Sequence, residues 1–139
     1  MPIQDLFSAD FKILGSAKVS ISSATTSNFD FGTPNDLDLA SLSNYEPGDK
    51  VLVVFVASTS GSTDIVSFSV QDAPDSAGSI GTPATAVTDG TLTGGTGDQY
   101  AKTAVRLQPG RPWLRCRVTS NGASDTFVAQ CVVLALPRA

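Results

Sequence analysis

The chain has 139 residues, a length that suits one domain and is too short for two. Only 16% of the residues are charged, below the roughly 25% of an average soluble domain, and the formal net charge is -4. This weak acidity argues against sequence-independent binding to nucleic acid phosphates. The chain has no histidine, which excludes Ser-His-Asp and Cys-His catalysis and most transition-metal sites. We therefore expect a binding protein rather than an enzyme, with no cofactor and no resident metal.

No segment of the sequence is typical of targeting. Residues 1–7 lack a basic stretch followed by an apolar run, so we expect no signal peptide. The longest apolar stretches, Val51 to Ala57 and Cys131 to Leu136, are too short to span a bilayer. Two cysteines do not make a secreted disulfide framework. We expect synthesis in a reducing cytoplasm and no membrane partner.

Residues 1–16 show no strand alternation but contain Phe7 and Phe11. The pattern predicts an extended N-terminal arm over 1–16, followed by a single domain over 17–139. An apolar arm on a soluble domain normally packs against another surface. We expect Phe7 and Phe11 to pack on a neighbouring subunit or on another protein.

Most of the remaining chain alternates with period two. This pattern predicts short strands within these segments: 18–21, 28–31, 51–56, 65–70, 85–87, 100–107, 113–119 and 126–136. The run from Val51 to Val56 is continuously apolar, which is typical of a strand buried on both faces. Residues 35–42 predict one helical turn at most. About eight strands separated by Pro-Gly, Gly-Ser and Asn-Gly turns indicate an all-β antiparallel sandwich or barrel.

The two cysteines, Cys116 and Cys131, flank Asn121-Gly122 in the connection between the last two strands. If these strands pair as a hairpin, the two residues lie close together on adjacent strands. Buried reduced thiols, a disulfide and half of a metal site all remain open at this point, and we favour buried thiols because free cysteine is a common small core residue.

Two acidic loops are the sharpest site candidates, Asp36-Leu37-Asp38 and Asp72-Ala73-Pro74-Asp75. Calcium needs six or more oxygen ligands, and the loops of a β-sandwich can supply them. Aspartate is also favoured in turns, where its carboxylate accepts backbone hydrogen bonds. Both interpretations stay open, and we favour the second.

The segment from Arg111 to Arg117 combines arginines with the single tryptophan. Alternation places Trp113, Arg115 and Arg117 on one side of a strand, and Leu114, Cys116 and Val118 on the inward side. This side could bind nucleic acid, but few arginines without further aromatic residues are a weak signal, and we favour a protein contact. A lone tryptophan is more typical of a core or interface position than of a sugar platform.

Charge is unevenly distributed along the chain. Residues 1–98 hold 3 basic and 12 acidic residues, whereas residues 99–139 hold 6 basic and 1 acidic. If the C-terminal strands share a face, the domain is electrically two-sided.

The order of these features resembles the capsid cement (decoration) proteins of tailed bacteriophages, in particular a short jelly-roll type. The similar segments, in chain order, are Leu6-Phe7-Ser8-Ala9-Asp10, Ser22 to Ser27, Asn28-Phe29-Asp30-Phe31-Gly32, Val51 to Val56, and Leu107 to Arg115. The resemblance covers nearly the whole chain and rests on order and spacing. The family often has a plainer Tyr-Leu-Arg where this chain has Arg111-Pro112-Trp113-Leu114-Arg115, and the segment from Gly78 to Gly97 is long here.

The resemblance implies a jelly roll that forms a homo-oligomer, a dimer or trimer, on the outer capsid surface. It implies that the protein bridges neighbouring major capsid proteins and stabilises the shell against internal DNA pressure. We expect contact with the capsid or with a second subunit through Phe7, Phe11, Arg111, Trp113, Arg115 and Arg117. The alternative is a carbohydrate- or host-surface-binding module of a phage particle, for which the aromatic candidates are Trp113, Tyr45 and Tyr100.

Overall fold

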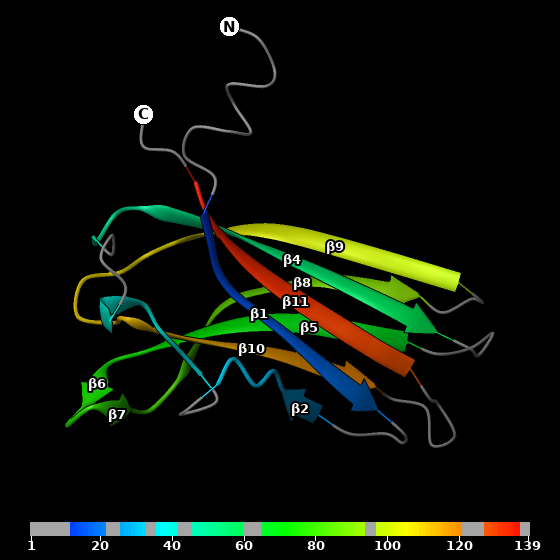
Figure 1. Cartoon of the computed structure of the whole chain (residues 1–139), viewed down its shortest axis with the longest axis horizontal. Helices are drawn as coiled ribbons and strands as arrows, with labels where there is room; N and C mark the ends of the chain where they lie inside the picture. The colour runs from blue at the N-terminus through cyan, green and yellow to red at the C-terminus, as the bar shows by residue number, and fades with distance from the viewer. Residues whose placement is uncertain are drawn as a thin grey trace, which may run out of the picture.

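The computed structural model describes residues 12–21, 26–32, 36–41, 46–59, 65–93, 97–120 and 127–136. Two antiparallel sheets make up the domain (Figure 1). Sheet A has the strand order β1 (Lys12–Ile21), β11 (Phe127–Ala135), β4 (Lys50–Thr59), β9 (Gly97–Arg106). Sheet B has the order β2 (Thr26–Asn28), β10 (Trp113–Ser120), β5 (Ile65–Ala73), β8 (Ala84–Thr93), and β3 (Leu37–Asp38) also pairs with β10. A small hairpin, β6 (Asp75–Ser76) and β7 (Ser79–Ile80), stands apart from both sheets.

The path of the chain between the sheets is that of a jelly roll. The chain passes from β1 in sheet A to β2 in sheet B, returns to β4, continues through β5 and β8, and then alternates through β9, β10 and β11. Two antiparallel sheets, of four and five strands, with repeated crossings of the chain between them fit this architecture. The expected all-β antiparallel sandwich of about eight strands is therefore confirmed. The described helical structure is one 3-10 turn, η1 (Leu39–Ser41), within the segment where one turn at most was expected.

The core lies between the two sheets and is built from their inward alternate residues. Phe55 of β4 stacks on Phe68 of β5, with ring centroids 4.9 Å apart, and meets the edge of Phe29 at 6.0 Å. All three rings are fully buried. Aromatic pairs of this geometry add to the stabilisation from burial itself, so these residues join the sheets at the centre of the sandwich.

The first strand begins earlier than the sequence pattern indicated. Residues 12–16 were assigned to the arm, but β1 starts at Lys12 and pairs with β11 from Lys12↔Ala135 onward. A β-bulge between Ile13 and Gly15 shifts the register, which explains why alternation is not visible there. A Cβ atom on Gly15 would lie 2.9 Å from Cδ1 of Phe31, so glycine allows this ring to pack against the bulge.

The run from Val51 to Val56 is not buried on both faces, contrary to expectation. Val51, Val53 and Phe55 point into the core and are buried, whereas Leu52 and Val54 are half-buried and Val56 is 39% exposed. The outer face of sheet A is therefore apolar without being covered by the described part of the chain. Among the described residues, no helix has the length and apolar character needed to cross a membrane.

Candidate protein-interaction site

Most of the arginines and the tryptophan of the segment Arg111–Arg117 bind aspartates of the same chain. Within β10, Trp113, Arg115 and Arg117 alternate with the inward Leu114, Cys116 and Val118. The turn before β10 places the first arginine of the segment. Arg111 donates its backbone N–H to the carbonyl of Gln108 at 3.3 Å, and Gly110 between them has a φ of 71°, as a Pro-Gly turn requires. From there, Nε of Arg111 donates to Oδ1 of Asp72 at 2.6 Å, and Nη2 donates to the Asp72 carbonyl at 2.8 Å. This ion pair closes the end of β5.

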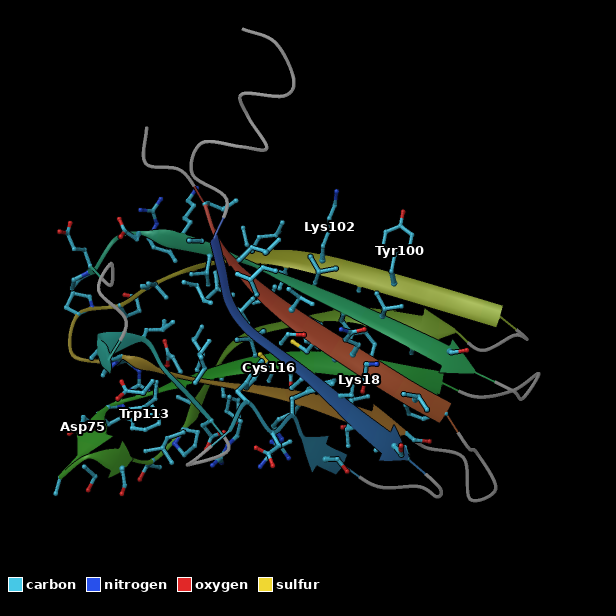
Figure 2. All side chains as sticks on the ribbon, viewed as in Figure 1. Lys18, Asp75, Tyr100, Lys102, Trp113 and Cys116 are labelled. Carbon is cyan, nitrogen blue, oxygen red and sulfur yellow. The ribbon has the colours of Figure 1, made fainter. Side chains whose placement is uncertain are left out.

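Trp113 lies next to Asp75, the first residue of β6 (Figure 2). Its side chain is 1% exposed, and its Nε1 donates a hydrogen bond to Oδ1 of Asp75 at 3.0 Å. The other carboxylate oxygen of Asp75 accepts the N–H of Gly78 at 3.1 Å, and these two bonds lower the pKa of Asp75, the indole bond contributing most. Ala73, opposite Trp113 on β5, is also fully buried. Trp113 is therefore held inside the domain, and its indole is not an exposed contact.

Arg115 forms a two-point ion pair with Asp36, which precedes β3. Nε donates to Oδ1 at 2.9 Å and Nη2 donates to Oδ2 at 3.0 Å. The Asp36 side chain is only 6% exposed, while that of Arg115 is 24% exposed. The hydrogen bond to Asp36 raises the pKa of Arg115, against the opposite effect of burial. Parallel Arg–carboxylate bonds of this kind fix orientation as well as charge, so this pair holds the β3 segment against β10.

Arg117 differs from its neighbours on the strand. It lies between Asn28 of β2 and Ser69 of β5, and its side chain is half-buried. Its Nε is buried and has no hydrogen-bond partner among the described residues. The segment therefore has two paired arginines and one whose Nε is unpaired within the part of the chain that the structure describes.

The acidic loops and the Arg–Trp segment, which sequence analysis treated as separate candidates, are thus partners of one another. Asp36, Asp72 and Asp75 accept hydrogen bonds from Arg115, Arg111 and Trp113, and Asp38 accepts the N–H of Ala40 at 3.1 Å. The expected backbone hydrogen bonds are found for Asp38, from Ala40, and for Asp75, from Gly78, whereas Asp36 and Asp72 accept hydrogen bonds from arginine side chains. Within the described ranges, no group of three His, Cys, Asp or Glu side chains is close enough to hold a metal ion.

The two cysteines face each other across the sandwich, not along a hairpin. Cys116 pairs with Val70 in sheet B and Cys131 with Phe55 in sheet A, so the expected pairing of the last two strands is wrong. Both cysteines are free and buried, as favoured. A hydrogen bond with Cys131, together with burial, raises the pKa of Cys116 well above its usual range. A thiol with this environment is protonated at neutral pH and is a poor nucleophile; Figure 2 places Cys116 between the layers.

The outer face of sheet A is the main feature that sequence analysis missed. It carries all four of the exposed large apolar side chains found among the described residues: Ile13 64%, Val56 39%, Tyr100 71% and Val128 49%. Half-buried apolar side chains fill the space between them on the same side of the strands: Leu52, Val54, Val132 and Leu134. We call these eight side chains the apolar face. Tyr100 and Lys102 project from β9 on this side (Figure 2).

Strand register shows that the apolar face is continuous across the sheet. Leu52 on β4 lies opposite Ala104 on β9 and opposite Leu134 on β11, and Leu134 in turn lies opposite Ile13 on β1. Further along β4, Val56 lies opposite Tyr100 on β9 but also opposite the polar Gln130 on β11, which lies opposite Lys18 on β1. Basic side chains therefore lie at both edges, with Lys18 on one and Lys102 on the other, both exposed. A signal for this face was present in the sequence, since a strand that is apolar on both sides needs something to cover each side.

The remaining sequence expectations for the site divide as follows. Phe7, Phe11 and Tyr45 lie outside the described residues. The C-terminal strands do not share a face, because Lys102 and Arg106 are in sheet A whereas Arg115 and Arg117 are in sheet B. The basic character of residues 99–139 is therefore divided between the two outer surfaces.

No protein-family model matches this sequence, and no curated protein matches it. Solved structures do share its fold. The structure of infectious bursal disease virus, Gt strain, aligns with a TM-score of 0.51 at 10% identity, covering 90% of this chain and 32% of that one. The enzymatically active domain of tailspike protein 4 from bacteriophage CBA120 aligns with a TM-score of 0.54 at 11% identity, covering 96% of this chain and 20% of that one.

A third likeness is to a bacterial enzyme. The CBM22-1 and GH10 modules of Clostridium thermocellum endo-1,4-beta-D-xylanase 10B, complexed with xylohexaose, align with a TM-score of 0.51 at 8% identity. That alignment covers 94% of this chain and 28% of that one. This chain spans a third or less of the length of each of the three proteins. At such low identity these likenesses establish one thing, that the chain has the jelly-roll β-sandwich fold.

Proposed function

We propose that this chain is a structural virion protein that binds the outer surface of an assembled phage capsid, bridges neighbouring major capsid proteins and stabilises the shell. The observation that carries the proposal is the apolar face of sheet A. Soluble domains rarely expose large contiguous apolar patches unless another surface covers them. A role in binding, without catalysis, fits a chain that has no histidine and a single glutamate.

Two further observations support the same role. The order of sequence features resembles the cement proteins of tailed phages, and the jelly-roll fold is shared with a protein of infectious bursal disease virus particles. Internal ion pairs close one side of the domain, which suits a rigid unit added to a preformed surface. To bridge the shell, each bound unit must contact more than one major capsid protein. We propose that a dimer or trimer of the chain supplies these contacts.

Stabilisation follows from linkage. A protein that binds the intact shell and not its separated subunits raises the free energy of disruption by about 2.7 kcal/mol per site when its free concentration is a hundred times Kd. Many copies act on one shell, so each contact needs only modest affinity. Synthesis in the host cytoplasm and a final position on the outer capsid surface complete the proposal.

The test is to compare capsids made with and without this protein. Capsids that lack it should assemble with normal geometry and release DNA at a lower temperature, and adding back the purified protein should restore their heat resistance. Absence of capsids would instead make the protein an assembly factor. Equal heat resistance with and without the protein would remove cementing as its function.

A second candidate function is binding of carbohydrate on a host surface. Tyr100, 71% exposed on β9, offers an aromatic ring on which the apolar side of a sugar can pack. The shared fold of a xylanase module solved with xylohexaose is compatible with this role. Binding to a glycan panel that is lost in Tyr100→Ala, together with no binding to capsids, would favour this candidate.

A further inference from the structure

We propose that the outer face of sheet A docks onto a protein surface that has an apolar centre and an acidic rim. This inference rests on the proposed function, within which that surface belongs to the capsid shell. It goes further by naming the side of the jelly roll that meets the shell and the chemistry that the shell must present there.

The charges around the apolar face identify the partner's rim as acidic. The charged side chains that the structure describes on this outer face are all basic and all exposed: Lys18, Lys50, Lys102 and Arg106. One acidic residue, Asp98, has a register position on the same side, opposite Ser58 near the start of β9. Lys18 and Lys102 are on the two edge strands, β1 and β9, so they flank the apolar centre from opposite sides. Charge complementarity at a rim steers association and fixes register, and like charges brought together oppose it.

The same charges disfavour a second copy of this chain as the occupant. Two such faces packed together would place basic edges against basic edges, without an acidic side chain among the described ones to compensate. Contacts between copies in an oligomer therefore use other surfaces. The apolar face is left for a different protein.

The size of the face indicates a contact that is weak singly and strong in an array. Four strands of about ten residues, spaced about 4.8 Å apart and rising about 3.3 Å per residue, give the whole outer side of sheet A an area of roughly 500–600 Å². A standard stable interface buries about 800 Å² on each partner. The face alone is too small for a tight isolated complex, but it suits a protein that binds a lattice in many copies and by more than one contact each.

The apolar side chains and the lysines of this face contribute to binding in different ways. Exposed apolar side chains, such as Val56 on β4 and Tyr100 on the edge strand β9, are desolvated on docking and supply most of the binding free energy. The lysines at the edges stay near solvent and supply orientation and association rate, an effect that salt screens. The two contributions can be separated by experiment because salt weakens only one of them.

The test measures binding of purified protein to capsids that were assembled without it. The double variant Lys18→Glu/Lys102→Glu should bind at least about tenfold more weakly than wild type at about 0.15 M salt. That difference should shrink towards about twofold at 1 M salt, where the screening length falls to about 3 Å. The matched control Lys18→Arg/Lys102→Arg keeps both charges and should bind within about twofold of wild type.

A second variant tests the contribution of the exposed apolar side chains. Val56→Ser/Tyr100→Ser should weaken capsid binding at least about tenfold at every salt concentration, with an unchanged circular dichroism spectrum and melting temperature. If Lys18→Glu/Lys102→Glu and Val56→Ser/Tyr100→Ser both bind capsids as well as wild type does, the docking face is wrong while the proposed function stands. If wild type itself does not bind capsids, both proposals fall.

Two other outcomes would also overturn the inference. Tighter binding by the Lys→Glu double variant would show that the partner's rim is basic. Sedimentation of wild type as an oligomer that Val56→Ser/Tyr100→Ser dissociates would show that a second copy occupies the face. Monomers or oligomers that are unchanged by this variant, combined with weakened capsid binding, are the expected result.

Discussion

The two outer faces of this jelly roll use their side chains in opposite ways. On sheet B, the polar and aromatic groups of the β10 segment bind aspartates of the same chain, and Trp113 is buried. On sheet A, apolar groups as large as Tyr100 are left in solvent with lysines beside them. The arginines and tryptophan that the sequence suggests as contact residues thus stabilise the domain. Apolar residues that the sequence suggests as core residues point outward from sheet A.

This difference has a structural cause. β3 lies beside β10 as a strand of sheet B, and Asp36, which precedes β3, binds Arg115. The β6–β7 hairpin brings Asp75 to Trp113. No described element lies over the outer side of sheet A, although its strands carry apolar side chains there, as strands of a buried surface do. Stability should therefore depend mainly on the outer face of sheet B, and binding mainly on that of sheet A.

The largest effect should come from Trp113. Trp113→Ala removes a fully buried indole and should lower the free energy of unfolding by about 3–5 kcal/mol. The matched control is Tyr100→Ala, the loss of an exposed aromatic ring, which should change it by no more than about 0.5 kcal/mol. Urea unfolding followed by circular dichroism measures both. Equal losses in the two variants would break the comparison between the faces.

A smaller effect is expected from the ion pair between Arg115 and Asp36. Asp36→Asn leaves the guanidinium without its charged partner and should cost about 1–2 kcal/mol, since the side chain of Arg115 is still partly in solvent. The double variant Asp36→Asn/Arg115→Gln should recover part of this loss. Unfolding free energies for the two single variants and the double variant complete a mutant cycle, and a coupling energy near zero would mean that the pair does not hold β3 in place.

The smallest effect concerns acid pH. Two hydrogen bonds lower the pKa of Asp75 from its ordinary value of 3.8, so the carboxylate is more acidic folded than unfolded. Its contribution to stability is present above about 3.8 and is lost as pH falls through the folded pKa, because the unfolded state then takes up the proton first. Trp113→Phe removes the larger of the two causes. Melting curves from neutral pH to about pH 2 should show a shallower acid decline in this variant than in wild type, after correction for its lower stability at pH 7; parallel curves would contradict the assignment.

Much of the fold could be predicted from local pattern. Period-two alternation correctly placed Leu114, Cys116 and Val118 inward on β10. It failed at Gly15, where a bulge interrupts the register of β1. It also failed for the pairing of Cys116 and Cys131, because a jelly roll carries the chain from β10 to the opposite sheet and a turn signal does not reveal which sheet comes next.

By itself the sequence determined most of the long strands, the inward side of β10 and the lack of histidine chemistry, because side-chain alternation is a property of the extended backbone and composition needs no fold. Only the tertiary structure decided which strands share a sheet and which outer side is covered. Those depend on contacts between residues far apart in the chain, such as Arg115 with Asp36 and Trp113 with Asp75. For the same reason, an outward Val56 cannot be distinguished from an inward Phe55 until the second sheet is in place on one side of β4.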